Sequence, residues 1–473
     1  MVLNLDFFAN FANLSFFSLL WYIITHGGWI IVVWGGIKIS QLVWLKRVRH
    51  HFEHQRSFLL LAINIPKLNE QSPKAVEQIF AQVHGALSGA DFYEKWWLGK
   101  TQERFSFEIV SSGGYIRFFV WTNTAFRDLI EAAFFSQYPD AEIIEVEDYT
   151  HHFPHKFPNP EWDMWGTEFI LTKHEAYPLR TYPEFEHTMS QELKDPLAGM
   201  LESMSKLGPD EHIWLQYVVQ PTGDGWKEHA QHIVDEMIGA HREHAPPFIT
   251  TLLGYPVKLF EFLLSFIFPP GEGGGEHGGG DEAPNKVQYL TPGERAVLEG
   301  VQLKMAKIGY FTKMRFVYIA KKEVFNKARG VVPILGAMRQ FSTQHMNGLS
   351  PSGKVTTAAK YYFVKERIAS KQRKLMHAFH LREDEAGEGE GKVLNIEELA
   401  TLYHFPVATV KAPLISKALT KQAEPPFALP VSERYAGSRI SRESTGVKHA
   451  PFRTPAQEPA HEQDGVPGDL PVA

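Results

Sequence analysis

A long apolar stretch followed by a basic one marks the start of the chain. Residues 7–37 contain no Asp, Glu, Lys or Arg and are rich in Phe, Leu, Ile, Val and Trp. Since about 20 apolar helical residues cross the hydrocarbon core of a bilayer, this stretch predicts a transmembrane helix. The Lys and Arg side chains from Lys46 to Arg56 predict an N-terminus outside and a cytoplasmic bulk. We therefore expect a single-span protein of the inner (cytoplasmic) membrane, anchored by residues 1–56.

A cleaved signal peptide and a buried helix are the alternatives to a membrane span. The signal peptide is disfavoured because Asp6 stands where Lys or Arg is usual, the apolar run is too long, and no small-x-small cleavage site follows. The buried helix is disfavoured because helices of globular domains seldom run so far without a charge.

Residues 57–150 alternate short apolar runs with amphipathic stretches. Strands are predicted at 58–65, 104–110, 115–121 and 141–146, and helices at 72–89 and 124–138. Ser72 and Thr124 are good N-capping residues for the two helices. The order β-α-β-β-α-β is that of a ferredoxin-like unit, in which two helices cover one face of a four-stranded antiparallel sheet.

A second round of strands and helices is predicted in residues 151–345. The strands are expected at 168–173, 212–220 and 311–320, and the helices at 195–207, 226–238, 291–309 and 323–341. This order echoes the first unit and indicates an internal duplication. The predicted fold class is therefore α+β, with an N-terminal transmembrane helix followed by two ferredoxin-like units.

An insertion at residues 245–288 interrupts the second unit. It contains the apolar segment 248–268 and a loop of Gly, Glu and His at 271–280. The apolar segment could be a second membrane span, an interfacial helix or a core helix. A full crossing would separate the two halves of the unit and leave strands unpaired, so the interfacial helix is preferred.

The rest of the chain divides into a loop with a basic helix (346–392), a linking segment (393–436) and a tail expected to be disordered (437–473). The basic side chains that we expect to contact DNA or anionic lipid are Lys365, Arg367, Lys371, Arg373 and Lys374. An acidic protein is another possible partner for this surface. The alternative is a solvated helix face without a partner.

Composition restricts the chemistry available to the chain. It has no cysteine, which excludes disulfides, thiolate metal sites, iron–sulfur clusters and cysteine nucleophiles. Any metal would have to bind His and carboxylate side chains. The net charge is −6, so any contact with nucleic acid must be local.

No motif predicts catalysis or a cofactor. Residues 348–355 nearly spell a Walker A loop, but Val355 stands where a Ser or Thr should bind Mg²⁺, so a loop between helices is favoured. His151, His152 and His155 could bring two imidazoles to one metal ion, as could His50, His51 and His54, but we identify no carboxylate that completes either set. We therefore expect a non-enzyme without cofactor or metal.

The linking segment predicts a docking element. Residues 395–403 should form a short amphipathic helix with Glu397 and Glu398 in its first turn and Leu399 and Leu402 on one side. The proline-rich chain that follows, including Phe405 and Pro406, is too short to bury itself. These six residues are therefore the expected contact with a partner protein.

Two stretches resemble a large uncharacterised bacterial family. The first comprises residues 65–85, 107–110 and 137–141, and members of the family are membrane-anchored and often continue into a HerA/TraG-like conjugation ATPase. The second, residues 394–406 followed by Glu424-Pro425-Pro426, resembles the segment that joins this part to the motor in type IV secretion proteins. Together they extend the resemblance to most of residues 57–430.

The resemblance implies a membrane-anchored, non-catalytic subunit of a translocation machine. Because the chain contains neither Walker A nor Walker B, the HerA/TraG-like ATPase is expected on a separate polypeptide, and an oligomer is expected. The alternative is a DNA-binding adaptor that delivers DNA to the motor through the basic helix and an exposed sheet. An enzyme with a His/carboxylate metal site is the third hypothesis.

Overall fold

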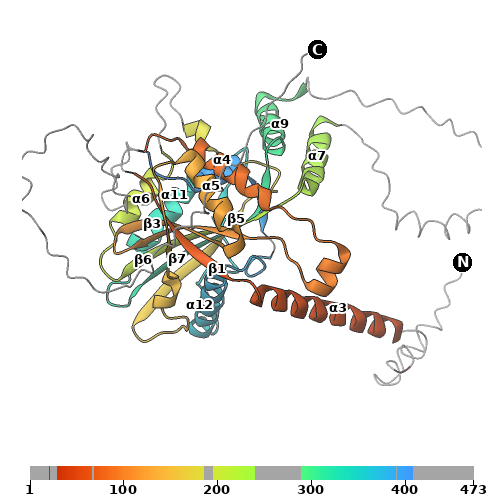
Figure 1. The fold of residues 1–473 in the computed structure, drawn as a ribbon, viewed down its shortest axis with the longest axis horizontal. Coiled ribbons are helices and arrows are strands. Elements are labelled where there is room, and N and C mark those ends of the chain that lie inside the picture. The colour runs from red at the N-terminus through yellow and green to blue at the C-terminus, as the bar shows by residue number, and fades with distance from the viewer. Residues whose placement is uncertain are drawn as a thin grey trace, which may run out of the picture. The chain divides into compact units, whose positions relative to one another are not determined.

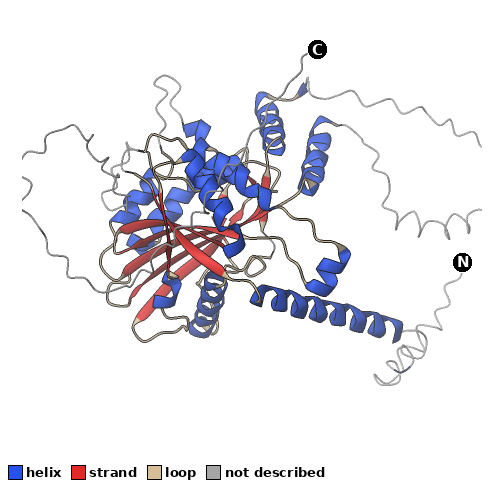
Figure 2. Ribbon diagram, viewed as in Figure 1, coloured by secondary structure: helices blue, strands red, loops and turns tan. Residues whose placement is uncertain are grey.

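A computed structural model describes residues 21, 29–66, 69–185, 195–239, 289–389 and 391–407 (Figures 1 and 2). Within these residues, nine strands form one antiparallel sheet in the order β4-β1-β3-β2-β6-β7-β5-β8, and β9 pairs with β7. Helices lie on both sides of this sheet (Figure 2).

The first half of the sheet is a β-α-β-β-α-β unit. Its elements are β1 (Phe58–Asn64), α4 (Pro73–Val83), η2 (His84–Ala86), η3 (Glu94–Leu98), β2 (Phe105–Ser112), β3 (Tyr115–Asn123), η4 (Thr124–Phe126), α5 (Arg127–Gln137) and β4 (Glu142–Val146). The hairpin predicted at 104–121 is confirmed as β2 and β3. Gly113 and Gly114 both have positive φ at its turn, which other residues adopt with strain. Asn123, not Thr124, caps the following helical turn by accepting from the Ala125 N–H.

The second half repeats this order around a longer connection. Its elements are η5 (Tyr149–His152), β5 (Trp162–Leu171), η6 (Tyr182–Phe185), α6 (Ala198–Ser205), β6 (Glu211–Pro221), α7 (Gly225–Ile238), α9 (Pro292–Met305), β7 (Gly309–Lys321), α10 (Lys327–Gly330), α11 (Val332–Arg339) and β8 (Leu349–Pro351). From the middle of the sheet outward, the strands of the first half are β2, β3, β1 and β4, and those of the second half are β6, β7, β5 and β8. In both halves these are the second, third, first and fourth strand in chain order. This common order is the structural form of an internal duplication.

The two halves are joined along β2 and β6. These strands pair antiparallel from Phe105 opposite Val219 to Ser112 opposite His212. The two units expected from the sequence are instead one continuous sheet. The physical reason is that β2 and β6 are both buried, so the backbone groups along these strands would lack partners if the units were separate.

Each face of the sheet is covered. On one face, a large apolar core collects side chains from α4, α5, α6, α11 and α13 (Ile396–Leu402). On the other face lies α12 (Val364–His380) (Figure 1). It packs through Leu375, Met376 and Phe379. A third cluster joins α7 and α9 to β9 (Lys392–Asn395). The insertion predicted at 245–288, with its apolar segment 248–268, lies outside the described residues.

The prediction of a transmembrane helix is wrong. No helix among the described residues is long and apolar enough to cross a membrane. Helix α3 (Trp29–His54) is uncharged only as far as Ile37, a stretch of roughly 14 Å against the ~30 Å of a hydrocarbon core. Residues 1–20 and 22–28 of the expected anchor lie outside the described residues. The single-span inner-membrane localisation, which rested on this helix, is corrected with it.

Instead, α3 contacts the folded part of the chain. The Trp44 indole N–H donates to the Trp96 carbonyl at 2.9 Å, and Arg104 pairs with Glu53 at 2.7 Å. Gly99 has a φ of +69°. A Cβ atom at this position would lie 2.5 Å from backbone atoms of Val48 in α3. The glycine therefore allows the π-helical turn η3 to approach the α3 backbone closely.

Candidate functional site

Four buried polar residues form a row across the sheet on the α12 face. The strand register places Glu108 of β2 opposite Gln216 of β6, Gln216 opposite Arg315 of β7, and Arg315 opposite Glu168 of β5. Each is at most 1% exposed. Because unpartnered buried charges are costly, such a row requires partners from outside the sheet.

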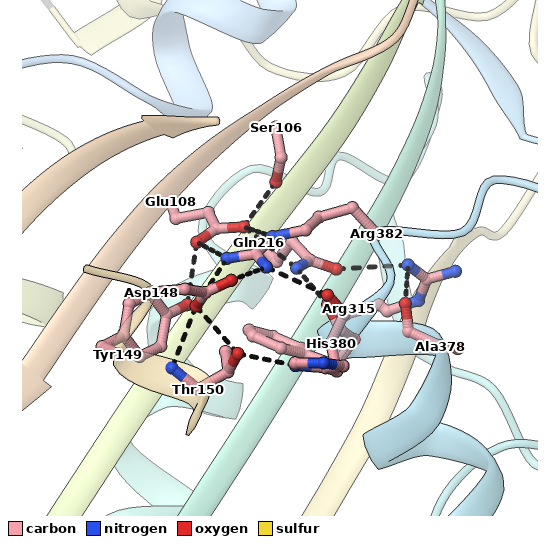
Figure 3. Close-up of polar contacts among 11 residues, drawn as sticks. Ser106, Glu108, Asp148, Tyr149, Thr150, Gln216, Arg315, Ala378, His380 and Arg382 are labelled. Carbon is pink, nitrogen blue, oxygen red and sulfur yellow. Dashed lines mark hydrogen bonds and ion pairs between the residues drawn. The ribbon is translucent and has the colours of Figure 1, made fainter. Parts of the chain in front are cut away.

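Arg382 supplies the partner at the Glu108 end (Figure 3). Its guanidinium donates to Glu108 Oε1 at 3.0 Å and also binds both carboxylate oxygens of Asp148. The Ser106 and Tyr149 hydroxyls donate to Glu108 at 2.7 and 2.8 Å. The network therefore joins β2, the turn after β4 and the end of α12.

The charges of Arg382 and of its two carboxylate partners stabilise one another. Burial lowers the pKa of Arg382, but the Glu108 and Asp148 carboxylates outweigh it and raise that pKa above its ordinary value. Burial raises the pKa of Asp148, but the hydrogen bonds and charge of Arg382 hold it below the ordinary value. Burial and the Glu108 carboxylate raise the pKa of Tyr149, which keeps its donating O–H.

The loop that follows Arg382 satisfies the other end of the row. Arg315 donates to the carbonyls of Ala378, Glu383 and Ala386, while Lys313 pairs with Glu168 at 3.0 Å. A Cβ on Gly387, where φ is +104°, would lie 2.3 Å from a Glu168 oxygen. Residues 383–389, which are rich in Gly and acidic side chains, are thus built into the fold, and the carbonyls of Glu383 and Ala386 accept from buried Arg315 and Lys313.

Histidines gather at the outer edge of this network. The His380 ring, at the end of α12, lies 4.9 Å from the His151 ring and 4.6 Å from the His155 ring, centroid to centroid. The His151 and His155 rings are 6.4 Å apart. Asp148, His151 and His380 each offer a ligand atom, and these atoms lie within 4.8 Å of one another.

Thr150 connects His380 to the network (Figure 3). Its hydroxyl donates to Asp148 Oδ1 at 2.8 Å and lies 2.8 Å from His380 Nδ1. Since that single hydroxyl proton is given to Asp148, His380 Nδ1 must be the donor in the second bond. Nε2 of a neutral His380 then keeps its lone pair. Burial, followed by the nearby His155, lowers the pKa of His380 and favours this neutral form.

A pocket of about 740 Å³ opens beside the histidines. Its lining comes from α3, β1, β3, the end of β4 and the end of α12, and includes His50, His54, His151, His377 and His380. Glu147 and Glu383 line it together with the basic Arg56 and Arg104 and with apolar side chains of β1 and β3. His380 therefore borders a pocket whose wall is both charged and apolar.

Only part of this constellation is visible in the sequence. His151, His152 and His155 stand together without an expected carboxylate, whereas Asp148 stands three residues before His151. His380 was not predicted, and the fold brings it to Thr150 from 230 residues away. The spacing Asp148-x-Thr150-His151 was the available signal for the missing carboxylate. No local signal existed for His380.

The predicted partner-binding residues lie mostly in the core. Glu398, Leu399, Leu402 and Phe405 are at most 2% exposed, and the leucines and Phe405 belong to the core on the α4 side of the sheet. Glu398 completes a capping box with Asn395 and pairs with Lys304 at 2.9 Å, both side chains fully buried. Glu397 pairs with Lys307, and the Pro406 carbonyl accepts from Asn69. Residues 396–406 therefore pack into their own domain, and the rest of the linking segment, from residue 408 onward, lies outside the described residues.

The basic helix is exposed where contact with DNA or lipid was predicted, with one exception. Lys365, Arg367, Arg373 and Lys374 are exposed. Lys371 is half-buried and donates to the carbonyls of Gly353, Thr356 and Ala358, so it holds a loop in place. The sequence that resembles a Walker A loop forms β8 and the turn after it, and Lys354 pairs with Glu388.

Comparison with known proteins gives a family but no activity. A family model described as a domain of unknown function (DUF8128) matches residues 60–417. No curated protein matches the chain.

Proposed function

Because the chain belongs to the DUF8128 family, which carries no assigned function, we propose from its architecture that it is a non-catalytic platform for a translocation motor. The partner is a separately encoded HerA/TraG-like ATPase of the conjugation type. The resemblance in residues 394–406 supports this choice of partner. No membrane anchor is part of the proposal.

One observation carries the proposal: the segment that resembles the joint to a motor is part of the core. Tyr403 and Phe405 are buried against Phe107 and Phe118 of the hairpin, with ring centroids 4.9 to 5.8 Å apart. His404 hydrogen-bonds Asp195 at 3.0 Å in the interior. The polypeptide that continues from these residues therefore begins at a position fixed by the core. The sheet domain can thus hold a motor in a defined position.

The test begins with the partner. Cross-linking in the native host, followed by purification through a tag on the full chain and mass spectrometry, should recover a protein that contains Walker A and Walker B motifs. Recovery of partners without a nucleotide-binding motor would overturn the proposal.

A truncation then locates the contact. Phe405 is the last residue of the core cluster, so a chain that stops after Val407 keeps the described core. We expect this variant to retain the melting temperature and to lose the motor. Retention of the motor would move the contact to the surface of the sheet domain.

A DNA-binding adaptor is the second candidate, and exposed aromatic residues favour it. Tyr361, Tyr362 and Phe363 are 81%, 85% and 77% exposed just before α12. Tyr361 and Phe363 have φ values of +67° and +55°, an unfavourable region for bulky residues. With Lys365 and Arg367 beside them, they offer a stacking platform and phosphate contacts for single-stranded DNA.

Fluorescence anisotropy with a labelled single-stranded oligonucleotide tests this candidate. Replacement of the three aromatic residues by Ser should weaken binding at least roughly tenfold, since stacking on each base contributes about 1–3 kcal/mol. Tyr289→Ser, at an aromatic residue that is 75% exposed elsewhere, is the matched control. Equal affinity in both variants would exclude the platform.

A further inference from the structure

The His380 imidazole lies at the spacing of a shared metal ion from the imidazoles of both His151 and His155. In a tetrahedral site with Zn–N bonds of about 2.0–2.1 Å, the ring centroids of two bound imidazoles lie roughly 5 Å apart. The observed separations are 4.6, 4.9 and 6.4 Å. His151 and His155, the pair with the longest separation, are both exposed.

The hydrogen bonds of His380 fit a metal ligand independently of this spacing. Metal-binding histidines usually donate their second N–H to an oxygen that fixes the tautomer and the ring. His380 Nδ1 has such a partner in the Thr150 hydroxyl, which is itself held by the Asp148 carboxylate. Asp148 is in turn fixed by Arg382. The unprotonated Nε2 is thereby left to bind a ligand.

Asp148 is better placed to orient than to coordinate. Its oxygens already accept from Arg382, from the Thr150 hydroxyl and from the Thr150 N–H. A metal ion bound directly to this carboxylate would lie next to the guanidinium and would be repelled by it. Arg382 donates to the backbone carbonyl of His380 and not to its ring.

We propose that His151, His155 and His380 bind one divalent transition-metal ion of the zinc type, with Thr150 and Asp148 orienting His380. Imidazole nitrogens suit zinc, copper and nickel, whereas calcium and magnesium prefer oxygen ligands. Three protein ligands leave the fourth position to water or a small ligand from the adjoining pocket. The ion ties the end of α12 to the connection between β4 and β5, where the two halves of the sheet meet in the sequence.

Metal titration of the full chain tests this proposal, which does not depend on the proposed motor. The protein is stripped with a chelator, and Zn²⁺ is added in competition with a chromophoric chelator. Co²⁺ provides a separate readout, because four-coordinate cobalt absorbs visible light far more strongly than six-coordinate cobalt. We expect one tight equivalent of zinc and the strong cobalt spectrum.

Matched variants identify the ligands. His151→Ala, His155→Ala and His380→Ala should each weaken zinc binding at least roughly tenfold, and Thr150→Val should weaken it roughly 10- to 100-fold. His152→Ala is the control, because His152 is an equally exposed neighbour without a ring contact to the cluster among the described residues. His151 and His155 are exposed, so their variants should keep the thermal unfolding of the stripped protein.

The outcomes separate a site from scattered histidines. Equal losses in His151→Ala and His152→Ala, a weak six-coordinate cobalt spectrum, or full zinc binding by His380→Ala would each overturn the proposal.

Discussion

The two faces of the sheet are built differently. The face under α4, α5, α6 and α11 carries one large apolar core, to which β1 contributes Leu59, Leu61 and Ile63. The face under α12 also buries apolar residues, but in its centre lie Glu108, Gln216, Arg315 and Glu168. An apolar face needs only side chains of the right size, whereas buried charges need specific partners. The candidate site therefore lies on the face where the packing is most specific.

The largest expected effect is on the apolar face. Leu399→Asp combined with Leu402→Asp places two carboxylates in the core, and we expect loss of cooperative unfolding in a urea titration. Val332→Asp, at a 60% exposed position on α11, should leave unfolding nearly unchanged. A double variant that folds normally would show that α13 can leave the core.

Breaking the polar row should cost nearly as much. Arg382→Met leaves the buried carboxylate of Glu108 and the partly buried carboxylate of Asp148 without their guanidinium, which should lower the free energy of unfolding by about 3–5 kcal/mol. Adding Glu108→Gln should recover part of the loss, because it removes one of the unpaired charges. If Arg382→Met lowers the free energy of unfolding by less than about 1 kcal/mol, water replaces the arginine as the hydrogen-bond donor to the two carboxylates.

The polar face should also make stability depend on pH through His212. This residue lies beside Phe153 and Trp162, and burial lowers its pKa from 6.5 to about 4. Between these pH values the unfolded chain binds more protons than the folded one. The contribution of neutral His212 to the free energy of unfolding is therefore complete above pH 6.5. As the pH falls toward 4, the free energy of unfolding decreases by up to roughly 3 kcal/mol.

Urea unfolding at pH 7 and pH 4.5 checks this prediction. His212→Gln should reduce the difference between the two pH values, while His229→Gln, at an exposed position on α7, should not. An unchanged difference in His212→Gln would assign the pH dependence to other groups.

The smallest effect is expected at Lys354, outside both faces. Its side chain is 81% exposed and pairs with Glu388, so Lys354→Ala should change the free energy of unfolding by less than about 1 kcal/mol. Since Val355 provides no hydroxyl for Mg²⁺, isothermal titration calorimetry should detect no ATP binding before or after the substitution. Micromolar binding lost in Lys354→Ala would contradict this.

Local signals located many of the elements. The β2–β3 hairpin follows from alternating Phe105, Phe107 and Ile109 and from the Gly113-Gly114 turn. Thr291 and Asn395 each begin a helix with a capping box. Such signals depend only on residues a few positions apart, so they can be read without knowing the fold.

The candidate site could be predicted only in part. His151 and His155 were visible as a group in the sequence, but His380 ends, and Arg382 closely follows, a helix whose sequence was interpreted as a basic surface. The same helix is exposed on one side through Arg373 and Lys374 and buried on the other through Leu375 and Met376. Which side met the sheet depended on packing against distant strands.

The sequence by itself indicated the four strands and two main helices of the first half, much of the second half except β8 and β9, the hairpin turn and the absence of cysteine chemistry. Only the tertiary structure decided that β2 pairs with β6, that residues 396–405 complete the core, and that Arg382 and His380 meet Asp148. The physical reason is the range of the interactions. Caps and periodicity act between near neighbours, whereas strand pairing and the partners of buried charges are fixed by contacts between residues far apart in the chain.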